Sequence, residues 1–198
     1  MNKKTFWIIV PISLLPYLIL FVLATIFFST KFSFFHFIME SVFQNNALNL
    51  LTFLLIYGIL IMLFSFICFI VSIYKKWDAV SLVEMAVIMK LIQVPAYIVI
   101  FIVGVLFSIT IFTIPFSIGL FLCDCISVFL TGIWVISSAI ITIRQGVFKM
   151  KEVRWVIILQ FIFCADVISS IIFYLKLKRF YSESHMQKQN GNIMECLS

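Results

Sequence analysis

The fold of this chain is decided by residues 91–143, which read LIQVPAYIVIFIVGVLFSITIFTIPFSIGLFLCDCISVFLTGIWVISSAIITI. The stretch contains a single charged side chain, that of Asp124. A helix of about 20 apolar residues is enough to cross the core of a lipid bilayer, so a run of this length holds two spans. The sequence therefore predicts an integral membrane protein built from helices that cross the bilayer.

The composition of the whole chain points the same way. Of the 198 residues, 64% are hydrophobic and only 11% are charged, whereas about 25% of the residues of a soluble domain are charged. The lysines and arginines behind the net charge of +6 gather at the ends of apolar runs, as membrane topology requires. We therefore expect the lipid bilayer, and no nucleic acid, to be the main partner of the chain.

Apolar runs long enough to span the bilayer recur along the chain. The predicted fold class is all-α, a polytopic integral membrane protein with five transmembrane helices and one interfacial amphipathic helix. The number of spans falls to four if the first segment is cleaved or the last does not cross. The predicted transmembrane bundle is a single domain of residues 1–178, with spans at about 5–28, 48–73, 79–109, 116–143 and 155–175, followed by a flexible polar tail at 179–198.

The first apolar run contains Pro11 and Pro16, which are expected to kink the helix. A signal peptide also begins with basic residues, but its apolar region is only about 7 to 15 residues long and ends at small residues. The run at 5–28 is longer and lacks such a cleavage site. We predict that it is retained as a span, with cleavage as the alternative.

Residues 31–46 have a helical period with two unlike faces. His36 and Glu40 fall on the polar face, whereas Phe35 and Met39 fall on the apolar one. Such a helix is predicted to lie in the plane of the membrane interface. No second metal ligand accompanies His36 at helical spacing, so we interpret it as a solvated histidine and predict no metal site.

Basic residues assign the ends of the spans to the two sides of the membrane. With the N-terminus in the cytoplasm, the basic residues at 75–76 and 144–154 and Lys90 fall on the cytoplasmic side, as the positive-inside rule requires. Lys90 is expected to extend its ammonium to the interface from the overlong third span. A fifth crossing, however, places the basic residues of 176–179 outside, against the rule. We predict a multi-pass protein of the inner or plasma membrane and leave the side of the tail open.

Two acids, Asp124 and Asp166, lie inside the fourth and fifth predicted spans. Ionisable groups in membrane helices mark pathways of substrates, ions or protons. Both lie about 12 to 15 Å from the outer end of their spans at the rise of a helix, so the two carboxyls can meet and share a proton or a cation. The candidate site comprises these acids and the nearest hydroxyl side chains, namely Asp124, Asp166, Ser127, Thr131, Ser169 and Ser170.

The alternative to a functional site is a structural role for both acids. Each Asp would then be protonated and hydrogen-bonded to a neighbour such as Ser127 or Ser170, which holds the helices together. Cys123 and Cys125 point to nearly opposite sides of a helix, so they cannot chelate one ion. The chain contains no phosphate-binding loop, zinc-protease motif or nucleophile elbow. We therefore assign no catalytic, cofactor-binding or metal-binding residue.

Two segments, MKLIQVPAY at residues 89–97 and QFIFCADVIS at residues 160–169, resemble an uncharacterised family of small polytopic bacterial membrane proteins of unknown function. The resemblance covers residues 77–178 and implies a bacterial inner membrane. It implies no activity, no cofactor and no site residue.

Three kinds of function are compatible with these patterns. The one that we predict is a non-enzymatic transport or channel-like component, in which Asp124 and Asp166 bind a proton, a cation or a small substrate. The second is a membrane interaction module, such as an accessory subunit, a sensor or a peptide-immunity protein, which binds a membrane protein or a second copy of the chain through residues 31–46 and 144–154. The third is an intramembrane enzyme that uses the two acids as general acid and base.

Overall fold

The computed structural model describes residues 3–75, 77–109, 111–160, 162 and 165–195. Among these residues it contains helices and turns and no strand, which confirms the predicted all-α class. In chain order the elements are α1 (Lys3–Phe28), α2 (Ser33–Ser41), α3 (Ala47–Tyr74), α4 (Ala79–Ser108), the 3-10 turn η1 (Ile111–Thr113), α5 (Ile114–Arg144), α6 (Met150–Leu159) and α7 (Ala165–Glu195).

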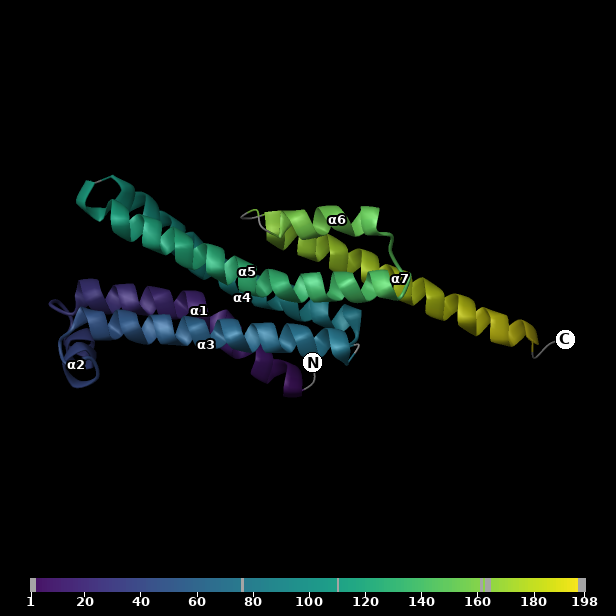
Figure 1. The fold of residues 1–198 in the computed structure, drawn as a ribbon, viewed down its shortest axis with the longest axis horizontal. Helices are drawn as coiled ribbons and strands as arrows, with labels where there is room; N and C mark the ends of the chain where they lie inside the picture. The colour runs from purple at the N-terminus through teal and green to yellow at the C-terminus, as the bar shows by residue number, and fades with distance from the viewer. Residues whose placement is uncertain (1–2, 76, 110, 161, 163–164, 196–198) are drawn as a thin grey trace.

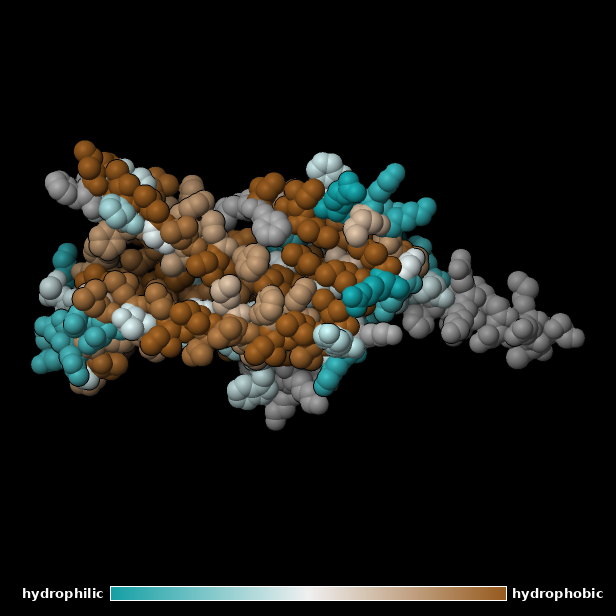
Figure 2. All heavy atoms as spheres, in the orientation of Figure 1, coloured by the Kyte–Doolittle hydropathy of each residue, from teal (hydrophilic) through white to brown (hydrophobic). Residues whose placement is uncertain are grey.

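Four of these helices, α1, α3, α4 and α5, are long and apolar enough to cross a membrane. They run side by side along the long axis of the molecule (Figure 1). Apolar side chains cover most of the visible surface of this bundle, and hydrophilic side chains gather toward its ends (Figure 2). This distribution is typical of a multi-pass membrane protein, whose solvent is lipid. The four helices coincide, within a few residues, with the first four predicted spans.

The most buried of the four helices is α5, in which 72% of the residues of the apolar segment lie inside the protein, against 11% in α3. Ser117, Asp124, Thr131 and Ser138 recur every seven residues along α5, a spacing that predicts a polar stripe facing the bundle. Thr131 and Ser138 are fully buried, in agreement with this prediction. Oγ of Ser138 donates a hydrogen bond of 2.7 Å to the backbone carbonyl of Ala79 in α4. The closest helix packing in the described part of the chain joins α4 and α5.

A proline in α1 provides an acceptor for a side chain of another helix. Because Pro16 has no N–H, the carbonyl of Ile12, four residues earlier, lacks its helical donor. Nε2 of Gln93 in α4 donates to this carbonyl at 3.0 Å. An unsatisfied carbonyl in the membrane core costs several kcal/mol, so this bond fixes α1 against α4 at the position of the proline.

The predicted count of five spans is not confirmed, because the fifth run is divided between two helices. α6 ends at Leu159 and α7 begins at Ala165. The two helices pack against each other and run in opposite directions (Figure 1). At about 1.5 Å per residue, α6 is only about 15 Å long, which is half of a bilayer core. We refer to α6 and α7 as the C-terminal hairpin.

The C-terminal hairpin returns the chain to the end of the bundle from which it departs. The loop between α3 and α4, the loop between α5 and α6 and the C-terminus all lie toward the same end, whereas α2 and η1 lie at the opposite one (Figure 1). Residues 176–179 therefore leave the bundle on the side of residues 144–154. α7 continues to Glu195, so most of the segment predicted as a flexible tail is helical.

The predicted amphipathic segment contains α2, which is shorter than residues 31–46. It is followed by a turn in which Gln44 and Asn45 adopt positive φ angles of 52° and 56°. Nδ1 of His36 lies 3.5 Å from a carboxylate oxygen of Glu40, and both side chains are exposed. The placement of α2 in a membrane interface stays a prediction.

Candidate functional site

Lys90 occupies the interior of the bundle rather than the interface predicted for it. The residue is fully buried in α4, and its Nζ lies 2.9 Å from Oδ2 of Asp166 in α7. The prediction that Lys90 extends to the membrane surface is therefore wrong. Its physical basis fails because a carboxylate lies within reach inside the protein, so the ammonium does not need water to balance its charge.

All three N–H bonds of the Lys90 ammonium have acceptors. Besides Oδ2 of Asp166, Nζ donates to Oε1 of Gln160 at 2.5 Å and to the backbone carbonyl of Asp166 at 3.4 Å. Oδ1 of Asp166 accepts from the backbone N–H of Val167 at 2.8 Å. Asp166 is the second residue of α7, where the positive end of the helix dipole favours a carboxylate. The ion pair is thus neutral as a whole and its polar atoms are satisfied.

Gln160 joins this ion pair to the turn of the C-terminal hairpin. Its amide Nε2 donates to the hydroxyls of Ser169 and Ser170 at 3.0 and 3.3 Å. These hydroxyls donate in turn to the backbone carbonyl of Asp166 at 3.1 and 2.6 Å. We refer to Lys90, Gln160 and Asp166 as the polar clasp, because they connect α4 with both sides of the hairpin turn.

A glycine of α5, Gly132, faces the polar clasp. A Cβ added at Gly132 would lie 3.5 Å from Cβ of Gln160, and the next nearest atoms also belong to Gln160. These are ordinary van der Waals distances, so α5 packs directly against Gln160, which is 1% exposed. The clasp is enclosed by α4, α5 and the hairpin.

Asp124 has an environment unlike that of Asp166. It is 8% exposed, and its Oδ1 has no hydrogen-bond partner among the described residues. No hydrogen bond joins the two carboxyls in the described part of the chain, where Asp166 pairs with Lys90 instead. The predicted sharing of a proton or a cation between the two acids is therefore not seen in this structure.

Tyr97 belongs to a second group of hydrogen-bonded side chains. Its hydroxyl donates to Oε1 of Gln93 at 2.8 Å and forms a second hydrogen bond of 2.9 Å with Oγ of Ser127. Both Asp124 and Asp166 are near enough to interact electrostatically with this hydroxyl. Through Gln93, the same group of side chains extends to the carbonyl of Ile12 in α1.

Tyr97 and Asp166 also form part of the wall of a pocket of about 380 Å³. The remaining lining is apolar and comes from α4, α5 and α7. The pocket lining comprises Val94, Tyr97, Ile98, Phe101, Val128, Asp166 and Val167. Because Asp166 and Tyr97 are only 2% and 6% exposed, the surface of this pocket is almost entirely apolar.

The six predicted site residues fall into separate groups. Asp166 belongs to the polar clasp and Ser169 and Ser170 bond to it, whereas Ser127 bonds to Tyr97. The hydroxyl of Thr131 donates to carbonyls of its own helix, that of Val128 at 3.1 Å among them. Asp124 remains apart from both groups in its hydrogen bonding.

Sequence reasoning missed four residues that organise the site. Three of them, Lys90, Gln93 and Tyr97, follow one another at spacings of three and four along α4, which places them on one helix face. This spacing was a readable signal of a polar stripe in α4. The fourth, Gln160, had no such signal, because its partners belong to other helices.

No protein-family model matches the chain, and neither a curated protein nor a solved structure matches it. The resemblance to a family of bacterial membrane proteins therefore stays a prediction, as does the bacterial inner membrane. In the described residues, no group of three His, Cys, Asp or Glu side chains is placed to hold a metal ion.

Proposed function

We propose that the protein is a non-enzymatic membrane transport component in which a proton or a cation binds at the buried acids. The observation that carries this proposal is the fully buried ion pair between Lys90 and Asp166 beside an apolar pocket. Apolar residues of similar volume in place of a buried ion pair are often neutral or stabilising, by up to about 4 kcal/mol. Stability alone is thus a weak reason for such a pair, and an ion pathway is a stronger one.

The chemistry of the site follows from the charge on Asp166. A proton or a cation that reaches this carboxylate removes the attraction that holds Lys90, and the polar clasp weakens on its α7 side. Asp124 offers a second carboxylate with an unsatisfied oxygen, and the Tyr97 hydroxyl lies near both acids. Binding of the ion therefore changes how firmly the C-terminal hairpin is attached to α4.

The interruption between α6 and α7 supports the same function. Helices broken inside the membrane are common in transporters, where they line substrate and ion sites near the middle of the bilayer. Non-helical backbone is tolerated there only if protein or a cavity surrounds it. Gln160, at this break, is 1% exposed and is bonded to the side chains of Lys90 and Ser169.

We further propose four crossings, with a hairpin that enters and leaves the membrane on the cytoplasmic side. The N-terminus and the C-terminus are then both cytoplasmic, in an inner or plasma membrane. The residues at 75–76, 144–154 and 176–179 all obey the positive-inside rule in this topology. The conflict that a fifth crossing creates for the last of these segments disappears.

Flux measurements on purified protein in lipid vesicles test the transport proposal. We expect a proton or alkali-cation flux that is lost in Asp124→Asn and in the double variant Lys90→Met/Asp166→Asn. The double variant removes both charges together, so no unpaired ion remains in the core. Flux equal to that of the unchanged protein in both variants would show that the acids serve only to hold the helices together.

A matched control separates loss of function from loss of stability. Ser138→Ala removes a buried polar group from α5, together with its bond to Ala79, but changes no charge. We expect this variant to unfold more easily and to retain its flux. Loss of flux in the control to the same extent would mean that the assay reports folding rather than the acids.

A further inference from the structure

A surface hollow of about 660 Å³ lies on α7 beyond the polar clasp. The residues that line it are Ile172, Leu175, Lys176, Lys178, Arg179 and Ser182. Most of them recur at spacings of three and four, so they share one side of the helix. These six residues thus form one continuous strip along α7.

The C-terminal part of this strip carries positive charge that no neighbouring acid balances. Lys176, Lys178 and Arg179 are exposed, and none of them forms an ion pair with a carboxylate in the described residues. Nζ of Lys178 lies 5.6 Å from the centre of the Tyr174 ring, a contact that orients the ammonium without neutralising it. Three neighbouring cations without acidic partners are a binding site for an anion.

The N-terminal part of the strip is apolar. Ile172 and Leu175 are 48% and 58% exposed, and they lie on the side of the cations that faces the polar clasp. Along a helix, Leu175 is only about 6 Å from Arg179. The ligand that fits both parts is an amphiphile, with an anionic group beside the cations and an apolar chain against the two aliphatic side chains.

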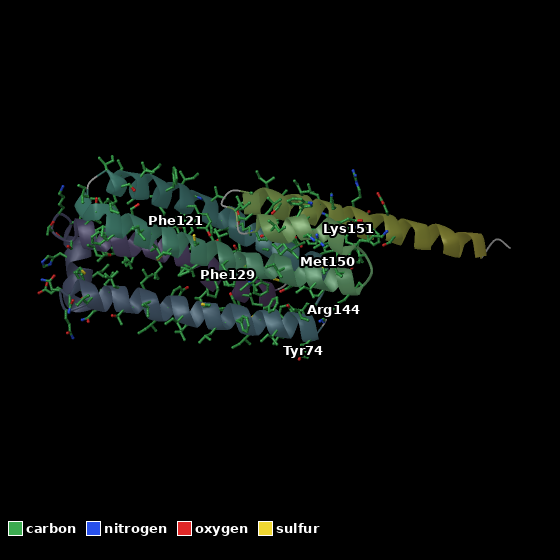
Figure 3. The ribbon with its side chains drawn as sticks, turned by 45° about the horizontal axis from the view of Figure 1, so that its top comes forward. Tyr74, Phe121, Phe129, Arg144, Met150 and Lys151 are labelled. Atoms are coloured by element: carbon green, nitrogen blue, oxygen red, sulfur yellow. The ribbon has the colours of Figure 1, made fainter. Side chains whose placement is uncertain are left out.

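The location of the strip decides which amphiphile can reach it. It begins where α7 still packs against the protein, since Phe173 and Leu177 are buried, and it continues toward the C-terminus. α7 leaves the bundle at the end where Arg144 and Lys151 are also found (Figure 3). Basic residues that follow directly on a membrane segment attract anionic lipids of the adjacent leaflet. We propose that α7 binds an anionic phospholipid, with its phosphate beside Lys176 and Arg179 and an acyl chain along Ile172 and Leu175.

Lipid retention by the full chain tests this proposal independently of any transport. The protein is placed in nanodiscs of phosphatidylcholine that contain a minor share of phosphatidylglycerol, and the lipid that stays bound after mild extraction is identified by mass spectrometry. We expect enrichment of phosphatidylglycerol. The variant Lys176→Gln/Lys178→Gln/Arg179→Gln should reduce its affinity by about fivefold for each cation removed.

A second triple variant is the matched control. Lys149→Gln/Lys151→Gln/Arg154→Gln removes the same charge from the same end of the bundle but does not touch the strip. It should retain the bound lipid, and Leu175→Ser should weaken the lipid without any change of charge. Thermal unfolding of each variant shows that the helix is intact, because glutamine at exposed positions preserves helix propensity.

Three results would overturn the proposal. The first is equal retention of phosphatidylcholine and phosphatidylglycerol, and the second is equal loss of lipid in the two triple variants. The third is displacement of the lipid by inorganic phosphate at the same affinity, with no effect of Leu175→Ser, which would assign the cations to a soluble anion.

Discussion

The two buried acids of this protein lie in similar sequences and in opposite environments. Asp124 is part of FLCDCIS at residues 121–127, and Asp166 is part of FCADVIS at residues 163–169. The carboxylate of Asp166 has an ammonium 2.9 Å away and a backbone N–H at 2.8 Å, whereas Oδ1 of Asp124 has no partner among the described residues. Similar local sequences therefore did not give the two acids similar environments: Asp166 lies at the start of α7 and pairs with Lys90 of α4, whereas Asp124 lies inside α5 and has no such partner.

The largest effect on stability is expected at Asp166, the acid whose carboxylate oxygens both have partners. Asp166→Asn removes the charge that balances Lys90 and leaves an ammonium buried in the core. We expect the free energy of unfolding to fall by about 3 to 5 kcal/mol, as measured by denaturant titration in detergent micelles. The double variant Lys90→Met/Asp166→Asn should recover most of this loss, and an equal loss in both variants would contradict the ion-pair explanation.

A smaller loss is expected at the amide of the polar clasp. Gln160→Leu preserves volume but removes an acceptor from Lys90 and a donor from Ser169. Buried groups that lose a partner cost about 1 to 3 kcal/mol, so we expect a decrease in stability of this size. Hydrogen exchange should rise in the C-terminal hairpin and not in α3, and a uniform rise across the chain would count against a local clasp.

The hydroxyl of Tyr97 is expected to contribute less to stability than the amide of Gln160. Tyr97→Phe keeps the ring in the pocket but removes the bonds to Gln93 and Ser127. Hydrogen bonds between membrane helices contribute about 0.6 kcal/mol each, so the loss should be about 1 kcal/mol. Unfolding in micelles measures it, with Tyr74→Phe in α3 as the control, because Tyr74 is exposed and its hydroxyl forms no hydrogen bond in the described residues. No loss in Tyr97→Phe would show that these bonds are replaced by water.

The smallest effect on stability is expected at Asp124, and it has the opposite sign. Asp124→Asn replaces a buried carboxyl that has an unsatisfied oxygen by a neutral amide of the same size. We expect the stability to rise by less than about 1 kcal/mol, and only at a pH at which the carboxyl is ionised, because burial of an unpaired charge is unfavourable. The same substitution thus destabilises at 166 and stabilises at 124. A loss of stability at both positions would indicate that Asp124 has a partner of its own.

The helices of spanning length were predictable because each depends on local composition. The division of the last span into two helices was not predictable. The summed free energy of transfer of residues 155–175 into lipid is the same for one long helix and for the two halves of a hairpin. Gln160, the polar residue at the break, changes this summed free energy little. At the break this amide bonds to Lys90, which lies 70 residues earlier in the chain, and no local pattern of residues predicts such a contact.

The site was predictable only in part for the same reason. The acids and the polar stripe of α5 were found from residue type and spacing. The partners of these residues depend on pairs far apart in sequence, such as Lys90 with Asp166, at a separation of 76 residues, and Gln93 with Ile12, at 81. Pro16 signals that a carbonyl of α1 is free, but no local pattern tells which helix supplies its donor.

The separation of 76 residues between Lys90 and Asp166 also has a consequence for the order of assembly. At about 5 to 20 residues per second, a ribosome needs on the order of 4 to 15 seconds to reach the acid after it has made the lysine. We expect Lys90 to remain in contact with water during this interval. A chain truncated after Gln160 should then expose the lysine to an amine-reactive probe, and protection of Lys90 in that chain would contradict this order. The final depth of α4 in the bilayer is therefore set late in synthesis, when the last helix arrives with the counter-charge.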